Sequence, residues 1–341
     1  MDEFYKVDVG VAQFTIPARY QDLRPVGTGA YGSVAHARDV LLDREVAIKK
    51  MLKPFQSDIH AKRTYRELKL LIHLNNEDAQ LLDVFTPDRD EETFNSLYFV
   101  LNYVPFDLSR VIKRNITFAE DHIRILIYAM LRGLKFIHSA GVIHRDLKPS
   151  NIGIDSDSNL WILDFGLARV AQPTPGILTG YVATRWWRAP EIMYNWEKYD
   201  PKADLWSVGC IMAELVLLKP LFAGKDHVEQ LDKILCIVGT PSEHKLAEIC
   251  EPYARDYIRN MGKRTKQDFQ KLFGTKRGPN GEITGGLSPE GIAFLEHLLE
   301  FDPRDRPSAE EALAIIWETV KSFEIPSWVT NGQQGDDDEE Q

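Results

Sequence analysis

The side chains best suited to chemistry are concentrated between residues 144 and 166. His-Arg-Asp-Leu-Lys-Pro-Ser-Asn occupies 144–151, and Asp-Phe-Gly occupies 164–166. In this pattern Asp146 is suited to accept the proton of a substrate hydroxyl, and Lys148 to neutralise charge on a phosphoryl group in transfer. Asn151 and Asp164 are suited to hold two magnesium ions. Each residue alone could be a turn or surface feature, but their combination at this spacing indicates phosphoryl transfer.

Three glycines upstream could let backbone N–H groups approach phosphate oxygens closely. They stand in Gly-Thr-Gly-Ala-Tyr-Gly at 27–32, after an extended segment at 23–26. Alone the pattern is weak, because a glycine hairpin without a ligand would look the same. A dinucleotide-binding fold would need a helix after the glycines. Residues 33–38 instead continue as a strand-like run, which argues against that fold.

A lysine and a glutamate follow at positions from which they could form an ion pair. Lys49 ends the apolar run Val-Ala-Ile at 46–48, where its ammonium could meet ATP phosphates. Glu67 lies in a helical stretch at 59–74 whose apolar residues share one face, so it can turn inward toward Lys49. Surface lysines and glutamates are common, so this pair depends on the motifs at 144–166 for support.

The elements that must position these residues fall into two groups. From residue 20 to about 104, short runs rich in β-branched and aromatic residues predict a small sheet, with the stretch at 59–74 as its one main helix. Beyond residue 106, long amphipathic segments predict a mainly helical lobe. Those segments lie at 121–139, 203–218, 228–238 and 289–300. Between 155 and 190 periodicity is weak, and so long an irregular segment is usually functional. The fold class is therefore α+β.

Whole-chain composition is that of an ordinary globular protein. With 341 residues, 44% of them hydrophobic, the chain can bury a substantial core. The net charge of -10 argues against general binding to nucleic acid or anionic membrane. The three cysteines, at 210, 236 and 250, fit free thiols in a reducing compartment. The chain shows neither a secretory signal nor a run of roughly 20 apolar residues. We expect a cytoplasmic protein with nuclear access.

From about residue 20 to 323 the sequence resembles the eukaryotic protein kinases, because the motifs above occur in that family's order and Ala-Pro-Glu follows at 189–191. It is most similar to the mitogen-activated protein (MAP) kinases. Thr-Gly-Tyr at 179–181 resembles the activation lip of their stress-activated subgroup, and residues 54–57, 60–68 and 81–87 strengthen that assignment. The resemblance implies a bilobal fold, with a small antiparallel-sheet lobe and a larger, mainly helical lobe.

The resemblance also sets the domain boundaries that we expect. Residues 1–19 would form an N-terminal extension, and 20–104 the ATP-binding lobe. Residues 105–325 would form the catalytic lobe, including the activation segment at 164–191 and a MAP-kinase-type insert region. Residues 326–341 form an acidic tail, which we expect to be disordered.

The function implied is that of a proline-directed Ser/Thr protein kinase in a stress-signalling cascade. It would transfer the γ-phosphoryl group of ATP with Mg²⁺, and phosphorylation of Thr179 and Tyr181 would activate it. The catalytic residues implied are Asp146, Lys148, Asn151, Lys49 and Glu67, with Asn151 and Asp164 binding metal. The ATP-binding residues implied are Val26, Gly27, Thr28, Gly29, Ala30, Tyr31, Gly32, Val34, Ala47, Lys49 and Leu101. The adenine would lie against a hinge at 101–106, with Leu101 as a gatekeeper bulkier than the threonine typical of the subgroup.

Phosphorylation adds roughly two negative charges and three acceptor oxygens, which arginines can receive. By resemblance, phospho-Thr179 would be received by Arg63, Arg66, Arg145 and Arg169. Arg185 and Arg188 would hold phospho-Tyr181 and shape a pocket that prefers proline after the acceptor. Each arginine could instead pair with a surface carboxylate. Structural roles are implied for Asp204, bracing the catalytic loop, and for Arg306, pairing with Glu191.

The implied partners are protein substrates with Ser/Thr-Pro sites, an upstream dual-specificity MAP kinase kinase, and phosphatases. We expect a monomer without direct nucleic-acid or membrane binding. MAP kinases usually continue after the kinase domain with a segment that carries an acidic docking patch. Residues 336–340 could substitute for that patch, although an acidic run of this kind is more often a solvated end. Trp187 replaces the usual tyrosine, keeping a ring but losing the hydroxyl. The loop before Thr179 and the glycine-rich stretch at 274–286 are longer than usual.

Two alternatives stay open. A catalytically weak scaffold or binding module on the same fold would usually have lost a lysine, aspartate or glycine needed for ATP chemistry, and none is lost here. A small-molecule kinase or nucleotide-dependent regulator would have little use for paired phospho-acceptors beside an Ala-Pro-Glu strip. Both are less favoured than an active protein kinase.

Overall fold

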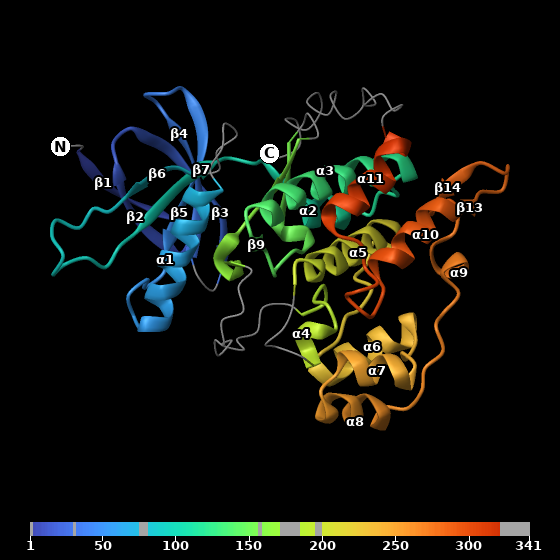
Figure 1. The fold of residues 1–341 in the computed structure, drawn as a ribbon. Helices are drawn as coiled ribbons and strands as arrows, with labels where there is room; N and C mark the ends of the chain where they lie inside the picture. The colour runs from blue at the N-terminus through green and yellow to red at the C-terminus, as the bar shows by residue number, and fades with distance from the viewer. Residues whose placement is uncertain are drawn as a thin grey trace. The chain divides into compact units, whose positions relative to one another are not determined.

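The computed structural model describes residues 3–29, 32–74, 81–155, 159–170, 185–194 and 200–320 (Figure 1). The chain divides into two compact units. The first consists of Met1–Pro105 with Phe165–Leu167, and the second of Phe106–Asp164 with Ala168–Gln341. The short segment at 165–167 therefore belongs, by its contacts, to the unit formed by the N-terminal part of the chain.

The first unit is built on a five-stranded sheet with the order β3-β4-β5-β7-β6, in which all neighbouring strands are antiparallel. Its strands are β3 (Tyr20–Gly29), β4 (Gly32–Asp39), β5 (Arg44–Met51), β6 (Leu81–Phe85) and β7 (Tyr98–Asn102). An antiparallel hairpin of β1 (Phe4–Val9) and β2 (Ala12–Pro17) precedes the sheet. Phe14 and Ile16 of this hairpin are fully buried in the same core cluster as Val46 and Ile48. The hairpin thus covers one face of the sheet, which was not predicted from the sequence.

The long helix α1 (Asp58–His73) belongs to the same unit. Its N-terminus is capped by Ser57, whose side chain accepts from the backbone N–H of His60. The residues that it buries, Thr64, Glu67, Leu70 and Leu71, recur at the three- and four-residue spacing of one helix face. The short 3-10 turn η2 (Phe165–Leu167) packs against α1.

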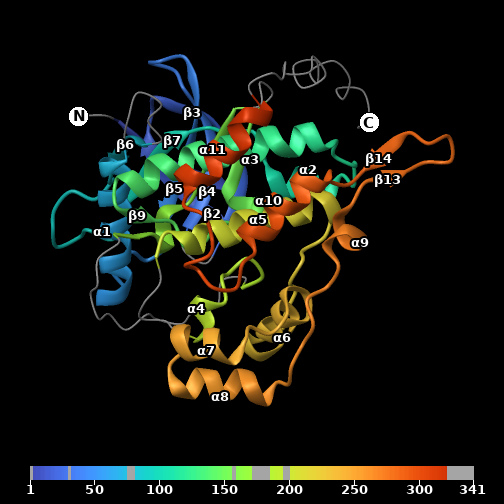
Figure 2. The same cartoon turned by 45° about the vertical axis from the view of Figure 1, so that its right-hand side comes forward.

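The second unit is mainly helical. Its helices are α2 (Leu108–Lys113), α3 (Glu120–Ser139), α4 (Glu191–Tyr194), α5 (Lys202–Leu217), α6 (His227–Val238), α7 (Glu243–Ile249), α8 (Pro252–Asn260), α9 (Phe269–Phe273), α10 (Pro289–Leu298) and α11 (Ala309–Val320). Helix α5 is the central element, because all its residues at 203–216 are buried. Helices α3 and α10 pack on α5, and α11 runs along α3 (Figure 2). Among the helices of the described segments, none is both long and apolar enough to cross a membrane.

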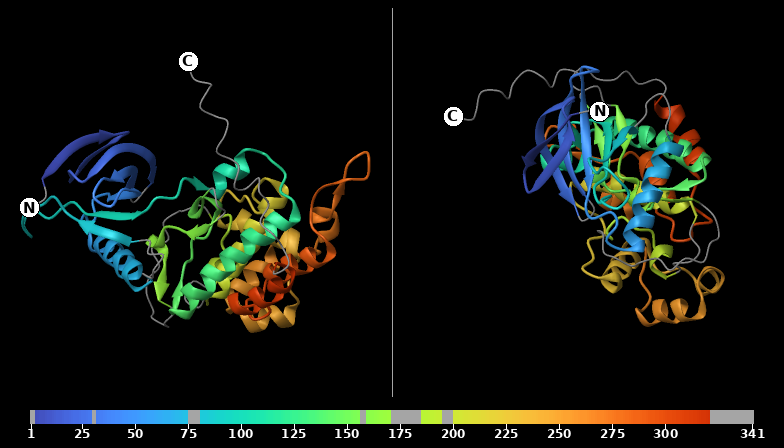
Figure 3. Two further views of the ribbon diagram at one scale, coloured as in Figure 1. Left: turned by 90° about the horizontal axis from the view of Figure 1, so that it is seen from above. Right: turned by 90° about the vertical axis from the view of Figure 1, so that its left-hand side faces the viewer.

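Short strands complete the second unit. One small sheet has the order β11-β10-β8, from β8 (Phe106–Asp107), β10 (Ile152–Ile154) and β11 (Leu160–Ile162). A second pairs β9 (Val142–Ile143) with β12 (Arg169–Val170), and the 3-10 turn η1 (Pro149–Asn151) lies between β9 and β10 in the chain. The glycine-rich stretch at 274–286 forms a hairpin of β13 (Lys276–Arg277) and β14 (Ile283–Gly285), visible in orange in Figure 3.

Candidate active site

An ion pair between a strand and a helix is the main polar feature of the first unit. Lys49 lies on β5 and Glu67 on α1, and Lys49 Nζ donates to Glu67 Oε1 at 2.6 Å. The two side chains are only 12% and 3% exposed, so their attraction is weakly screened by water. Glu67 faces inward because Thr64 and Leu71, about one turn away on either side, are buried on the same helix face. The pairing expected from the sequence is therefore present.

The register of the sheet places four predicted ATP-binding side chains on one face. Val34 is opposite Lys49, and Ala47 is opposite Leu101. Side chains alternate along a strand, so all four point away from the core cluster on the other face. The core-facing neighbours in β4 and β5 are Ala35, Ala37, Val46 and Ile48.

The glycine-rich segment lies at the end of the β3–β4 pair. Gly27 is opposite Val34, Thr28 opposite Ser33, and Gly29 opposite Gly32. Side chains added at Gly27 or Gly29 would meet nothing within 4 Å, so the backbone there is open to a ligand. A Cβ at Gly32 would lie 2.8 Å from the Lys50 carbonyl oxygen, which explains why this position must be glycine. The predicted ATP-binding residues Ala30 and Tyr31 lie outside the described residues.

In the second unit, three predicted catalytic side chains form one hydrogen-bonded group. Lys148 Nζ donates to Asp146 Oδ2 at 2.7 Å. Asn151 Nδ2 donates to the same Asp146 oxygen at 3.2 Å and to the Asp146 carbonyl at 2.9 Å. Asp146 is 8% exposed, so its carboxylate is held in a nearly buried position. The tight η1 turn brings these residues together.

The predicted metal-binding pair is joined by the backbone. The Leu163 N–H donates to the Asn151 carbonyl at 2.8 Å. Asp164 is the next residue after Leu163, so this hydrogen bond keeps it close to Asn151. Because the Asn151 amide nitrogen is engaged by Asp146, the amide oxygen is the atom that could bind a cation. Carboxylate and amide oxygens are ligands that Mg²⁺ accepts, so the donor set fits this ion. Within the described segments, no group of three or more His, Cys, Asp or Glu could hold a metal.

Backbone strain is present at both ends of this site. Arg145 has φ +71° and Asp164 has φ +62°, in the left-handed region that costs a non-glycine residue about 1–3 kcal/mol. Arg145 is held there by Asp204 of α5, whose Oδ1 accepts from the Arg145 N–H at 2.8 Å. Asp204 Oδ2 accepts from the His144 N–H at 2.8 Å and lies 2.9 Å from His138 Nε2. Asp204 thus braces the catalytic loop, as expected from the sequence.

The electrostatics of Asp204 follow from these contacts. Burial alone would raise the pKa of Asp204. The hydrogen bond from His138, the nearby charges of His138 and His144, and the Arg145 N–H together hold the pKa of Asp204 below its usual value. The carboxylate therefore stays ionised although it is fully buried.

The structure places the predicted phosphate-receiving arginines in three groups. Arg63 and Arg66 lie on α1, next to Glu67. Arg169 lies on β12, opposite Ile143 of β9. Ile143 precedes Arg145 by two residues in the chain. Arg185 NH1 donates to the Lys225 carbonyl at 2.6 Å. Their expected ligands, the acceptors Thr179 and Tyr181, lie outside the described residues.

Arg185 and Arg188 share a cationic environment with a histidine at the start of α6. Burial, together with the charges of Arg185 and Arg188, lowers the pKa of His227, and Asp226 opposes the shift. His227 is therefore neutral near pH 7, and the two arginines carry the positive charge of this group.

Trp187 is tied to α5 by its side chain and its backbone. Its indole Nε1 donates to Glu214 Oε2 at 2.9 Å, and its carbonyl accepts from Ser207 Oγ at 2.7 Å. The indole therefore supplies a donor where the loss of a tyrosine hydroxyl was expected. Glu214 is 6% exposed, and burial raises its pKa to about 7, although the Trp187 hydrogen bond acts in the opposite direction.

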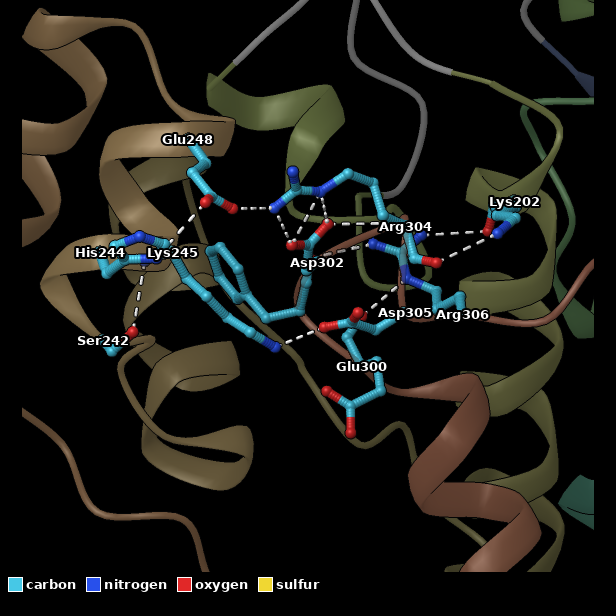
Figure 4. A network of polar contacts seen from close by, with 11 residues as sticks. Lys202, Ser242, His244, Lys245, Glu248, Glu300, Asp302, Arg304, Asp305 and Arg306 are labelled. Atoms are coloured by element: carbon cyan, nitrogen blue, oxygen red, sulfur yellow. Dashed lines mark hydrogen bonds and ion pairs between the residues drawn. The ribbon is translucent and has the colours of Figure 1, made fainter.

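Trp187 belongs to a strip at 185–191 that ends at Glu191, and Arg306 anchors this end. Its NH1 and NH2 donate to the two carboxylate oxygens of Glu191 at 2.7 and 2.6 Å, and both side chains are buried. Figure 4 shows the polar network around Arg306. Within it, Arg304 NH2 contacts both Glu248 of α7 and Asp302 at 2.7 Å. The predicted Arg306–Glu191 pair is therefore part of a larger anchor between α5, α7 and the loop before α11.

Sequence reasoning missed two residues that support the site. His138 lies in the last turn of α3, and only the fold brings it to Asp204. Glu214 interrupts a nearly continuous apolar stretch of α5, which was a usable signal, because a carboxylate in a buried helix needs a partner.

Comparison with known proteins agrees with this geometry. The model of the protein kinase domain matches residues 20–317. Mitogen-activated protein kinase p38b of Drosophila melanogaster is 48% identical over 92% of this chain and 83% of the relative. Mitogen-activated protein kinase pmk-1 of Caenorhabditis elegans is 48% identical over 91% of this chain and 78% of its own. Mitogen-activated protein kinase 14 of Xenopus laevis is 48% identical over 91% of this chain and 82% of its own.

The chain belongs to the protein kinase family and, within it, to the mitogen-activated protein kinases. It is an ATP-dependent Ser/Thr protein kinase with the α+β fold expected from the sequence. Family membership implies ATP and a divalent metal ion as cofactors, and protein substrates and upstream kinases as partners. Nothing in the comparisons favours the scaffold alternative.

Proposed function

We propose that this kinase acts in a stress-signalling cascade, phosphorylates Ser or Thr before proline, and is activated by phosphorylation of Thr179 and Tyr181. The observation that carries the catalytic part of the proposal is the group formed by Asp146, Lys148 and Asn151, in a loop held in place by Asp204. A scaffold would gain nothing from a nearly buried carboxylate kept in a strained loop.

In the proposed mechanism, Asp146 accepts the proton of the substrate hydroxyl as that oxygen attacks the γ-phosphorus of ATP. The bond from phosphorus to the bridging oxygen breaks, and ADP leaves. Lys148 neutralises charge on the transferred group, and Asn151 and Asp164 would hold Mg²⁺, which neutralises phosphate charge when bound. Lys49, oriented by Glu67, would contact the ATP phosphates. Catalysis then comes mainly from positioning and charge stabilisation.

ATP binding is proposed for the sheet face that carries Val34, Ala47, Lys49 and Leu101, and for the open backbone at Gly27 and Gly29. The adenine would hydrogen bond to backbone groups of the segment at 101–106. Leu101 at the gatekeeper position would restrict access to the space behind the adenine.

Regulation is proposed through the arginines. Phospho-Thr179 would recruit Arg63, Arg66, Arg145 and Arg169, and phospho-Tyr181 would bind Arg185 and Arg188. The anchoring of Trp187 and Glu191 supports a fixed strip in which Arg188 shapes a pocket for proline. The proposed partners are a dual-specificity upstream kinase, phosphatases and Ser/Thr-Pro substrates, with the kinase itself acting as a monomer.

The test is transfer of labelled γ-phosphate to matched Ser-Pro and Ser-Ala peptides, before and after phosphorylation by a dual-specificity kinase. We expect strong transfer to the Ser-Pro peptide only, and only after phosphorylation. The variant with Thr179→Ala and Tyr181→Phe should stay inactive after the same treatment. Equal use of both peptides would contradict proline direction, and full activity of the double variant would contradict the switch.

A further inference from the structure

One residue on the proposed ATP-binding face belongs to no motif. His36 of β4 is directly opposite Ala47 of β5, which in turn is opposite Leu101 of β7. The three side chains therefore form a row across three neighbouring strands, on the same face as Lys49. Ala47 and Leu101 belong to the predicted ATP site, and His36 shares their row.

His36 is held by two contacts. Its ring lies 4.3 Å from the ring of Tyr103, centroid to centroid, with a tilt of 52° between the planes. Tilted rings at this separation attract each other through their quadrupoles. On its other side His36 Nε2 is hydrogen bonded to Glu45. The imidazole is 18% exposed, so most of its surface is covered by the protein.

The position of His36 is set by the rigid part of the sheet. Ala37, Val46 and the other core-facing residues of β4 and β5 are fully buried, which fixes the pleat on which His36 and Glu45 lie. Glu45 is 3.9 Å from Arg38 of β4, which adds a second link between the two strands. Tyr103, in contrast, follows the end of β7 and lies in the segment at 101–106 proposed to meet the adenine.

We propose that His36 is a positioning residue for ATP, which acts by holding Tyr103 and thereby the segment at 101–106. The inference rests on the proposed function, because it takes that segment and the row containing Ala47 and Leu101 as the adenine site. Ordering the segment before ATP arrives lowers the entropy cost of binding. Loss of His36 therefore weakens ATP binding and leaves the transfer step unchanged. A role in packing alone would change stability and leave ATP affinity as it was.

The experiment compares three substitutions at His36 in the doubly phosphorylated kinase. His36→Ala removes both contacts, His36→Phe keeps the ring and loses the bond to Glu45, and His36→Gln keeps a donor and loses the ring. From the strength of one aromatic pair, we expect the KM for ATP to rise about 3- to 10-fold in His36→Ala and His36→Gln. His36→Phe should restore most of the affinity. In all three, kcat and the KM for the peptide should stay within about twofold of the wild type.

Tyr103 supplies the partner test. Tyr103→Leu should reproduce the effect of His36→Ala, and the double variant should show no further loss, because the two residues act as one unit. Tyr103→Phe keeps the ring and is the matched control at that position. His244→Ala is the control for removing a histidine, since the His244 side chain is 84% exposed on α7.

ATP dissociation constants from titration calorimetry on the same variants distinguish failure of this inference from failure of the proposed function. If the wild type transferred no phosphate, the proposed function would fail, while the calorimetric constants would still test His36. An unchanged ATP affinity in a folded His36→Ala variant would overturn the inference. So would equal changes in ATP and peptide KM accompanied by a lower melting temperature, because these would indicate a packing role only.

Discussion

The pKa values of two buried carboxylates on α5, Asp204 and Glu214, are shifted in opposite directions. The difference is explained by the hydrogen-bond donors that each carboxylate has. Asp204 has two backbone N–H donors and His138, which more than offset burial and keep its pKa low. Glu214 has the Trp187 indole, which does not offset burial, and its pKa rises to about 7. Asp204 is thus charged near pH 7, whereas Glu214 titrates close to neutrality.

The first prediction concerns Glu214. The pKa of Glu214 is about 7 in the native state, above the ordinary 4.5. Between these two pH values the native state binds more protons than the unfolded state, so the free energy of unfolding falls as the pH rises. Glu214→Gln removes this cost. At pH 8 the variant should gain up to about 3 kcal/mol in free energy of unfolding, and at pH 5 much less. Urea unfolding at the two pH values measures the difference, and an equal effect at both would contradict the raised pKa.

The candidate site was only partly predictable at this scale. Lys49, Glu67, Asp146, Asn151 and their partners stand in motifs whose spacing reveals their chemistry. His36, His138 and Glu214 do not, because each acts through one neighbour that strand register or helix packing brings to it. His36 and His138 are lone side chains that give no periodic signal, whereas Glu214 could be detected only as a carboxylate in an otherwise apolar helix.

At the scale of elements, α5 is the support for the catalytic loop and for the strip at 185–191. Helix α5 presents Asp204, Ser207 and Glu214 at intervals along its length. Asp204 binds residues 144 and 145, and the other two bind Trp187. A single rigid helix therefore sets the distance between the catalytic loop and the strip.

The second prediction follows from that support. In Asp204→Asn one oxygen acceptor becomes an amide NH₂ donor that faces a backbone N–H, so the free energy of unfolding should fall by about 2–4 kcal/mol. The strained φ of Arg145 then loses its restraint, and kcat should fall while the ATP dissociation constant changes by less than about threefold. Glu290→Gln, at an exposed position on α10, is the matched control. A loss of stability with unchanged kcat would show that Asp204 holds the fold and not the loop geometry.

The third prediction concerns the anchor at Glu191. Arg306→Met leaves a buried carboxylate without its partner, which should cost about 3–5 kcal/mol. The double variant Arg306→Met with Glu191→Met should be more stable than the single variant, because no buried charge is left. Lys271→Met breaks a pair with Asp268 whose side chains are 84% and 52% exposed, and should cost less than about 1 kcal/mol. Denaturant unfolding of the three variants tests this order.

Elements were predictable where a pattern repeats over several turns. The predicted helices agree with α3, α5, α6 and α10 to within two residues at each end. Strands β8 to β12 are two or three residues long, and pairing across the fold defines them, so no alternation could reveal them. The β1–β2 hairpin was not predicted, although Phe14 and Ile16 show the alternation of a half-buried strand.

At the scale of the whole molecule, the proposed catalytic set is divided between the two units. Lys49 and Glu67 belong to the first, whereas Asp146, Asn151 and Asp164 belong to the second. Each half is ordered by contacts within its own unit: an ion pair on the sheet in the first, and the η1 turn braced by α5 in the second.

The central claim is that this chain is an active phosphotransferase whose proton acceptor is Asp146. Its most direct test is single-turnover transfer of labelled γ-phosphate to a Ser-Pro peptide by doubly phosphorylated wild type and Asp146→Asn, with ATP affinity measured on both. We predict that the variant transfers about 10²- to 10⁴-fold more slowly and binds ATP with nearly unchanged affinity. Transfer at the wild-type rate by the variant, or ATP binding by the wild type without any transfer, would contradict the account.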